Sequence, residues 1–448
     1  MDGQCCAGGV RFRLYPKPPY VHPEWPPETI SVSSPPGSIG PGPADARMRL
    51  ILPVDKRYSY GVNPGPLGTP RLDLPPYRGR IRHPVCPDEE GHFDSIPEGT
   101  PEFAEAHVFG TVRFVLDIWE RYFGRPIEWH FARDYRQLEI VILPRIDNAY
   151  AGYGFMEIGA HPQEDGTLAP YAVNFDVMAH ELGHLIIYST IGVPSPSARR
   201  AEYYGFQESA ADTTAIIAVL HFESLIERLL EETHGNLYVF NELNRFGELS
   251  DHEQVRLASN DVKLSRFSAG WDDEHKLSQP LTGAIFDIGV DIFQEFLVER
   301  GVIPRDVAEA TRKVRHAPEL AQIVQPVFDA AYEGRYQEFR SALIDARDYV
   351  GAALAETWKR LRADDFSYLD VGLVLLEMDR AMSGGRYRRA IAESFDWREI
   401  GRVTVGPRLK PPGRHSHTHS PRTITPDIGE RLPRMTYRER AIAAGIGR

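Results

Sequence analysis

Hydrophobic residues recur at helical spacing along residues 100–123. Thr100 suits a helix N-cap, Pro101 suits the first helical position, and Gly124 is a typical stop. This pattern predicts a long helix with one buried face. The positions that share this face are Val108, Val112, Val115, Trp119 and Tyr122.

Two short segments have the composition and alternation of β-strands. Residues 47–53 read RMRLILP, and residues 138–143 read LEIVIL, which is rich in β-branched side chains. The segment that follows, DNAYAGYGFMEIG, combines glycines with aromatic residues in the manner of an edge hairpin. The sequence therefore predicts strands in the front part of the chain.

From residue 176 onward the hydrophobic pattern is mostly helical. A front part with strands and a back part with helices predict an α+β protein. The expected helices span residues 176–190, 207–230, 281–300, 306–315, 318–333, 336–362 and 371–384.

Both ends of the chain are rich in proline. Residues 16–43 also contain many serines and glycines, and residues 403–448 are basic. Such compositions favour loosely packed chain. We expect a mobile N-terminal segment over residues 1–46, an α+β lobe over 47–190, a helical lobe over 191–402 and a basic tail over 403–448.

The bulk composition limits the partners and the compartment. The net charge of -12, from 51 basic and 63 acidic residues, argues against nucleic acid as the main partner. The sequence contains no run of eighteen apolar residues, so it predicts no transmembrane segment. Its first residues lack the apolar core of a signal peptide. We therefore expect a cytoplasmic protein, or one exported without a cleavable signal peptide, of undetermined oligomeric state.

The stretch DVMAHELGH, residues 176–184, contains the pattern HExxH. On a helix, His180 and His184 project from one face, so both imidazoles can reach a single ion about 2.0–2.1 Å from each nitrogen. Glu181 flanks that ion, where its carboxylate can deprotonate a water molecule. Asp176 is a suitable N-cap for this helix. HExxH also arises by chance, so further ligands are needed to support a metal site.

A second acidic cluster follows in QESAADTTAIIAVL. Glu208 can be the third protein ligand that catalytic zinc requires, on a helix expected to begin near Gln207. Asp212 lies one turn further, where it can accept a hydrogen bond from a ligating histidine. Two carboxylates among small and apolar residues need a buried partner, and a cation would supply one. Together the two clusters predict a single catalytic Zn²⁺ bound by His180, His184 and Glu208.

HExxH with a downstream ExxxD resembles the thermolysin-like and fungalysin-like zinc metallopeptidases of the gluzincin clan. The similarity runs, with gaps, from about residue 100 to residue 402. It implies an endopeptidase with a two-lobed fold, in which the zinc site lies in the cleft between a strand-containing N-terminal lobe and a mainly α-helical C-terminal lobe.

The resemblance also implies residues that bind a peptide or protein substrate. Asn148 and Ala149, in DNAYAG, match the edge segment that holds the substrate backbone. Val177 matches a wall of the pocket for the residue after the scissile bond, which implies a hydrophobic preference there. Arg256, in VRLASND, matches an arginine near that pocket.

The family's catalytic histidine matches His275 in GWDDEHKLSQPLTGAIFDIG. Asp272 or Asp273 would accept a hydrogen bond from its ring. In the family a turn of small residues follows the histidine and opens a helix, and Thr282 and Gly283 match that turn.

The chain also departs from the family. The tyrosine that helps to hold the oxyanion would fall in VPSPSARR, which contains none, although Tyr203 or Tyr204 could replace it from a shifted loop. The acidic calcium-binding loops are absent too, so Ca²⁺ is not indicated. Two other functions therefore stay open: a catalytically inactive relative that serves as a binding or interaction protein, and a zinc hydrolase that acts on a non-peptide amide.

Overall fold

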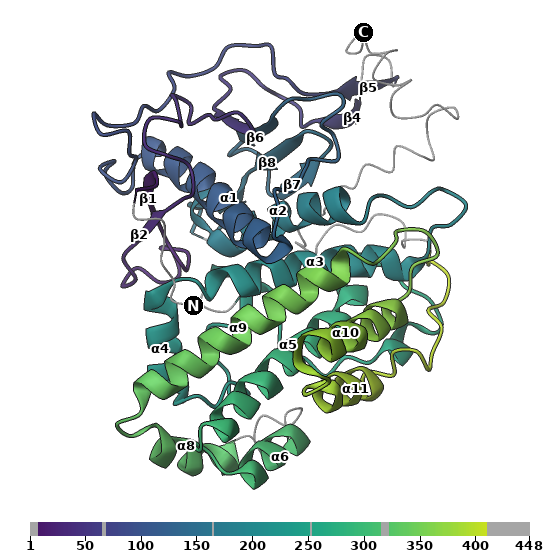
Figure 1. The fold of residues 1–448 in the computed structure, drawn as a ribbon. Coiled ribbons are helices and arrows are strands. Elements are labelled where there is room, and N and C mark those ends of the chain that lie inside the picture. The colour runs from purple at the N-terminus through teal and green to yellow at the C-terminus, as the bar shows by residue number, and fades with distance from the viewer. Residues whose placement is uncertain (1–7, 65–68, 164, 251–252, 315–321, 410–448) are drawn as a thin grey trace. The chain divides into compact units, whose positions relative to one another are not determined.

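The computed structural model describes residues 8–64, 69–163, 165–250, 253–314 and 322–409 of the 448-residue chain (Figure 1). Its contacts divide the chain into two units. Within the described residues, unit 1 comprises 8–117 and 128–185, and unit 2 comprises 118–127 and 186–409. The mixture of strands and helices is that of an α+β protein, as expected from the sequence. None of the described helices is long and apolar enough to cross a membrane.

Unit 1 contains a four-stranded sheet in the order β3-β6-β8-β7. β6 pairs in parallel with both of its neighbours, and β7 pairs antiparallel with β8 and forms one edge. The strands expected over 47–53 and 138–143 are confirmed as β3 and β6, and the expected edge hairpin is confirmed as β7 and β8. The bounds are β3 Met48–Ile51, β6 Leu138–Ile142, β7 Ala149–Gly152 and β8 Phe155–Ile158.

Three antiparallel pairs of strands complete the strands of unit 1. They are β1 Arg11–Leu14 with β2 Glu28–Ser31, β4 Gly61–Pro64 with β5 Pro70–Asp73, and β9 Ala160–Pro162 with β10 Leu168–Pro170.

The long helix α1, Pro101–Phe123, confirms the expectation for residues 100–123. The backbone N–H of Phe103 donates to the Thr100 hydroxyl at 3.1 Å, which is the predicted N-cap. Gly124 has a φ of +66°, a left-handed conformation that suits glycine and ends the helix.

The expectation of a mobile segment over residues 1–46 was wrong for its described part. Phe12, Trp25 and Ile30 are at most 3% exposed. Phe12 lies so close to α1 that a Cβ on Gly110 would sit 2.7 Å from its ring. The prolines set an extended backbone here, but the apolar residues between them are buried in unit 1. The expected basic tail lies outside the described residues from residue 410 onward.

Unit 2 is mainly helical and is organised around α5, Glu274–Glu299. Helices α3, α9, α11 and α6 all contact α5 (Figure 1). The other helices are α3 Ala201–Val219, α4 Glu223–Thr233, α6 Arg305–Val314, α8 Gln325–Tyr332, α9 Tyr336–Trp358, α10 Tyr368–Ser383 and α11 Arg388–Trp397, with short 3₁₀ turns at Leu264–Phe267 and Gln322–Val324.

Two parts of unit 2 differ from the expectation. The single helix expected over 207–230 is interrupted after Val219 and continues as α4, and α3 begins six residues before Gln207. The sequence around this interruption contains no glycine or proline, and apolar residues continue on both sides of it. The interruption therefore has no local signal. The hairpin of β11, Arg245–Ser250, and β12, Glu253–Leu257, lies between the expected helices 207–230 and 281–300, where no strand was expected.

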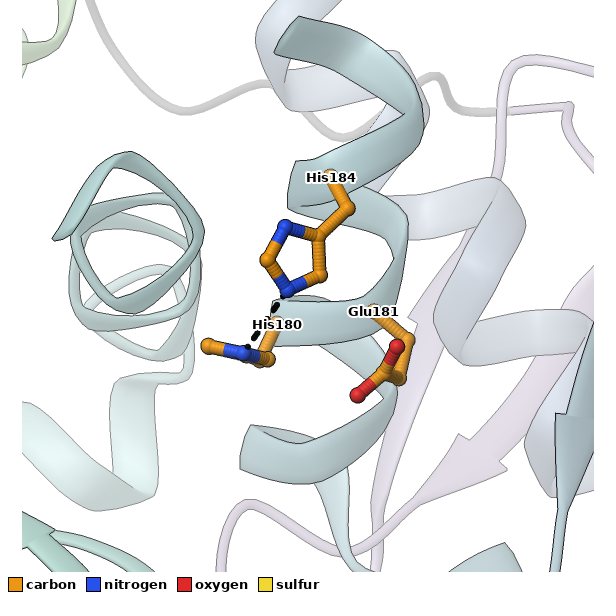
Figure 2. Close-up of side chains that lie close together, drawn as sticks. All are labelled: His180, Glu181 and His184. Carbon is orange, nitrogen blue, oxygen red and sulfur yellow. Dashed lines mark hydrogen bonds between the residues drawn. The ribbon is translucent and has the colours of Figure 1, made fainter. Parts of the chain in front are cut away.

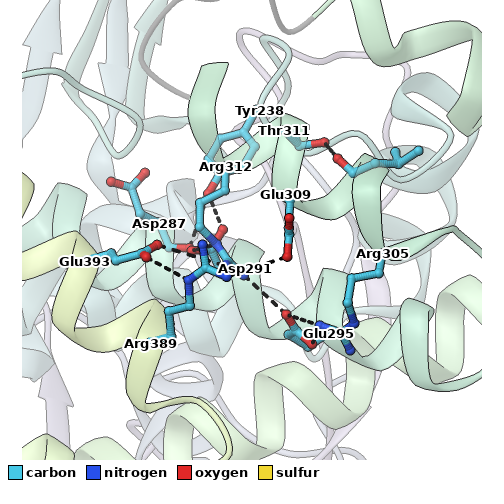
Figure 3. A network of polar contacts seen from close by, with 11 residues as sticks. Tyr238, Asp287, Asp291, Glu295, Arg305, Glu309, Thr311, Arg312, Arg389 and Glu393 are labelled. Atoms are coloured by element: carbon cyan, nitrogen blue, oxygen red, sulfur yellow. Dashed lines mark hydrogen bonds and ion pairs between the residues drawn. The ribbon is translucent and has the colours of Figure 1, made fainter.

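A buried polar network connects α5 with α6 (Figure 3). Asp291, which is fully buried on α5, accepts from the Arg312 guanidinium at 3.1 Å and from the Tyr238 hydroxyl at 3.0 Å. Arg312 and Arg305 of α6 also reach Glu295, at 3.3 and 3.1 Å. Buried charges are tolerated when they are paired and hydrogen-bonded in this way.

Candidate metal centre

The HExxH residues lie on helix α2, Phe175–Thr190, which confirms the helix expected over 176–190. The Nε2 atoms of His180 and His184 are 3.1 Å apart, and their ring centroids are 4.7 Å apart (Figure 2). Both rings and Glu181 are at most 4% exposed. One ligand atom from each of the three residues lies within 4.8 Å of the others. Spacing along one helix is thus enough to bring the three groups together.

This group fits a metal ion. Two nitrogens that each lie about 2.0–2.1 Å from a tetrahedral zinc are about 3.3 Å apart, and the observed distance of 3.1 Å is close to that separation. Imidazole nitrogens are ligands of zinc and of several other transition metals. The described part of unit 1 therefore contains a potential metal-binding group.

Helix α2 begins differently from the expectation. The expected N-cap, Asp176, is wrong: the Asn174 side chain caps the helix by accepting from the Val177 N–H at 3.2 Å. Asp176 instead accepts from the Lys17 ammonium at 3.0 Å, and their side chains are only 3% and 1% exposed. A residue of the supposedly loose N-terminal segment thus neutralises a charge four residues before His180.

The expected third ligand, Glu208, lies on α3 in unit 2 and is 2% exposed. Its Oε2 lies 3.4 Å from Nε2 of His275. Asp212, one turn further on α3, accepts from the Thr282 hydroxyl at 3.3 Å. Each carboxylate thus has a polar neighbour within unit 2, so burial alone does not require that a cation accompany them.

His275 lies on the first turn of α5, where Asp273 fixes its ring. Asp273 is the N-cap and accepts from both the backbone N–H and Nδ1 of His275, each at 2.9 Å. Burial alone would raise the pKa of Asp273, but the hydrogen bonds and charge of His275 outweigh it and lower the pKa to about 2. Asp272, the alternative partner, instead lies 3.8 Å from Lys276.

The small-residue turn expected at Thr282 and Gly283 was wrong, because both residues lie inside α5. A Cβ on Gly283 would sit 2.5 Å from the Arg398 guanidinium. The glycine therefore makes room for Arg398, which pairs with Asp287 at 2.9 Å.

Of the two replacement tyrosines, Tyr203 is a poor oxyanion donor. Its hydroxyl donates to the Gly192 carbonyl at 2.5 Å and accepts from Gln207 at 2.7 Å, and its ring is 2% exposed. Burial raises its pKa well above the ordinary value. The ring of Tyr204 lies 5.9 Å from that of Trp271, and a role for Tyr204 as the oxyanion donor stays a prediction.

The expected substrate residues are distributed over both units. Asn148 precedes the edge strand β7, which begins at Ala149, and its carbonyl accepts from the Gly159 N–H at 2.9 Å. Val177 is 7% exposed on the first turn of α2. Arg256 lies in β12 of unit 2, and its side chain is outside what the structure describes.

One polar cluster beside this edge strand was not anticipated. Asp147 lies next to Asn148, and its Oδ1 is 3.0 Å from Nδ1 of His161 and 3.1 Å from the Tyr171 hydroxyl. Tyr171 belongs to the 3₁₀ turn Tyr171–Val173 that precedes α2. No local pattern indicates this cluster, because its members come from three separate segments of the chain.

No sequence-family profile matches this chain, and no curated protein matches it. Among solved structures, the chain is similar to the precursor of protealysin, a metalloproteinase from Serratia proteamaculans, with 13% sequence identity and a TM-score of 0.39. The match covers 80% of this chain and 88% of that chain. A likeness at this level supports neither a family nor an activity, so the function must be judged from the residues themselves.

Proposed function

We propose that this chain is a zinc-dependent endopeptidase in which His180 and His184 bind the metal and Glu181 is the general base. The geometry on α2 carries the proposal: two Nε2 atoms 3.1 Å apart, with a carboxylate in the same buried group. A buried group of this kind suits a catalytic ion better than a chance HExxH on a solvated helix face.

Glu208 is the proposed third ligand. Catalytic zinc sites commonly have three protein ligands and keep one position open. Glu208 follows the HExxH helix in the chain, and its carboxylate is buried on α3. Asp212, hydrogen-bonded to Thr282, is proposed to orient a ligating histidine.

When bound, Zn²⁺ would supply a Lewis acid that polarises the scissile carbonyl and lowers the pKa of water towards 7. The Glu181 carboxylate accepts a proton from the attacking water and passes it to the nitrogen of the leaving amine. Asp273 holds Nδ1 of His275, which directs Nε2 to donate to the negative charge that develops on the carbonyl oxygen. Glu181 thus moves the proton, and His275 stabilises the charge.

The edge strand β7 supports a peptide as the substrate. An extended peptide can pair with the edge strand of a sheet as an additional strand, which fixes its backbone with little side-chain selectivity. Asn148 and Ala149, at the start of β7, are proposed to make these backbone contacts. Val177 supports a hydrophobic preference for the residue after the scissile bond, and Arg256 is proposed to lie near that pocket.

Metal analysis combined with a peptide-cleavage assay tests this proposal. Purified protein should contain stoichiometric zinc, and a chelator should abolish cleavage. Glu181→Gln should retain zinc but lower kcat about 10²- to 10⁴-fold, whereas His180→Ala should lose the metal. Glu102→Gln, at an exposed position of α1, is the matched control and should cleave like the wild type. Wild-type protein without bound metal would overturn the proposal.

The second candidate function is a catalytically inactive binding protein with the same metal site. The position of Tyr203 favours this function, because its hydroxyl donates to the Gly192 carbonyl. Tyr203 therefore does not replace the tyrosine that is expected to donate to the oxyanion. Stoichiometric zinc with no turnover on a diverse peptide library would support this function. Cleavage that depends on Glu181 would exclude it.

A further inference from the structure

The helical core of unit 2 contains an apolar pocket whose lining includes none of the residues proposed to bind the metal or to move a proton. It has a volume of about 50 Å³. Its walls come from α3, α5, α9 and the segment before β11, and they include Ile217, Leu237, Phe286, Leu343 and Val350. This volume is roughly four times the 10–15 Å³ that one water molecule needs.

Water is a poor occupant of this pocket. A buried water makes about three hydrogen bonds to polar groups, and three polar side chains of the lining already have partners. The Thr213 hydroxyl donates to the Ser209 carbonyl at 2.7 Å, and the Thr282 hydroxyl donates to Asp212 at 3.3 Å. Arg347 donates to the Leu220 carbonyl at 2.9 Å and to Asp348 at 2.8 Å.

Gly289 marks a gap in the wall. It lies within α5, where glycine is about 1 kcal/mol less favourable than alanine. A Cβ built on Gly289 would meet no heavy atom within 4 Å, and no positive φ requires a glycine there. Gly283 on the same helix differs, because a Cβ there would collide with Arg398. The backbone and the neighbours of Gly289 thus leave room for a side chain that the sequence does not supply.

We propose that this pocket binds a small uncharged apolar molecule of about six to eight heavy atoms, since four waters occupy about 120 Å³ in the liquid. Benzene and toluene, with six and seven heavy atoms, have suitable size and polarity. The bound molecule would contact Thr213 and Thr282, and Thr282 hydrogen-bonds Asp212. It would therefore touch α3 and α5, the helices that carry Glu208 and His275.

The test is direct binding to the full-length protein, with benzene and toluene as probes, by ligand-observed NMR and thermal unfolding. At ten times Kd, the ratio of folded to unfolded protein should rise about 11-fold. Gly289→Val should weaken binding at least tenfold, because its side chain fills the gap. Ala381→Val, at an exposed position of α10, adds two methyl groups outside the pocket and should bind like the wild type.

Ala346→Val, which narrows the pocket from α9, provides a second filling variant if Gly289→Val does not fold. Absence of binding to the wild type, or unchanged binding by a folded filling variant, would overturn the proposal. Phenol and pyridine, which carry polar atoms on rings of similar size, should bind more weakly than benzene. Equal binding would show a polar pocket and contradict it. These readouts do not depend on zinc or on peptide cleavage, so they remain informative if the proposed function fails.

Discussion

The buried pair of Lys17 and Asp176 should stabilise the helix that carries HExxH. Their charged atoms are 3.0 Å apart, and the side chains are 1% and 3% exposed. At this distance the attraction is about 5–6 kcal/mol for an effective dielectric constant of about 20. Lys17→Met removes the ammonium from a buried carboxylate, and such a change costs about 3–5 kcal/mol of unfolding free energy.

The assay is urea unfolding of the wild type, of Lys17→Met, of Asp176→Leu and of the double variant. Each single variant should unfold at lower urea. The double variant should recover most of the loss, because replacing both buried charges with apolar groups is often neutral or stabilising. Amide hydrogen exchange should show the loss in the first turns of α2, which carry His180 and Glu181.

An exposed pair provides the control for this cycle. Arg200 and Asp365 are 2.5 Å apart, but their side chains are 62% and 64% exposed. Arg200→Met should therefore lower the unfolding free energy by at most about 1 kcal/mol. If Lys17→Met unfolds at the same urea concentration as the wild type, or if the double variant only adds the two losses, the pair does not hold α2 in the way described.

Three further predictions concern glycine packing, pH and the site. Gly283→Ala should lower the unfolding free energy by about 1–3 kcal/mol, because the new Cβ would displace the Arg398 guanidinium. Gly289→Ala should instead raise the unfolding free energy by about 0.5–1 kcal/mol, and thermal unfolding of both variants checks this contrast. Burial lowers the pKa of His107 to about 4, so between about pH 6.5 and 4 the unfolded chain binds a proton that the folded chain excludes. The wild type should therefore lose up to about 3 kcal/mol of unfolding free energy over this pH range. In urea unfolding measured against pH, His107→Gln should show a smaller loss over the same range. Asp273→Asn should lower kcat about 10- to 100-fold, because the ring of His275 loses its hydrogen-bond partner, while the zinc content stays unchanged. Glu208→Gln should instead weaken zinc binding, and equal effects of the two variants on zinc content would contradict these separate roles.

The elements that could be predicted are those whose cause is local. α1 follows from a helical period with a capping threonine and a terminal glycine, and the structure contains both caps. The group on α2 follows from the same rule, because residues four apart on a helix always share a face. No knowledge of the rest of the fold is needed to bring His180 and His184 together.

The errors came from features whose cause lies far away in the chain. Lys17 and Asp176 are 159 residues apart, so no local pattern could pair them. Proline content made the N-terminal segment look loose, although Phe12 packs against α1 almost 100 positions later. Gly283 was interpreted as a turn, but its small size serves Arg398, which comes from beyond α11.

The contact between Glu208 and His275 bears on both proposed roles. A carboxylate has two oxygens with about four acceptor positions, and the contact with His275 involves only Oε2. Binding a metal through Oε1 is therefore compatible with this contact. A bound cation would withdraw electron density from the carboxylate and weaken its attraction for the imidazole, whereas loss of the metal would strengthen it. The same residue pair would then link metal occupancy to the position of His275, because the metal and the His275 ring would share one buried carboxylate.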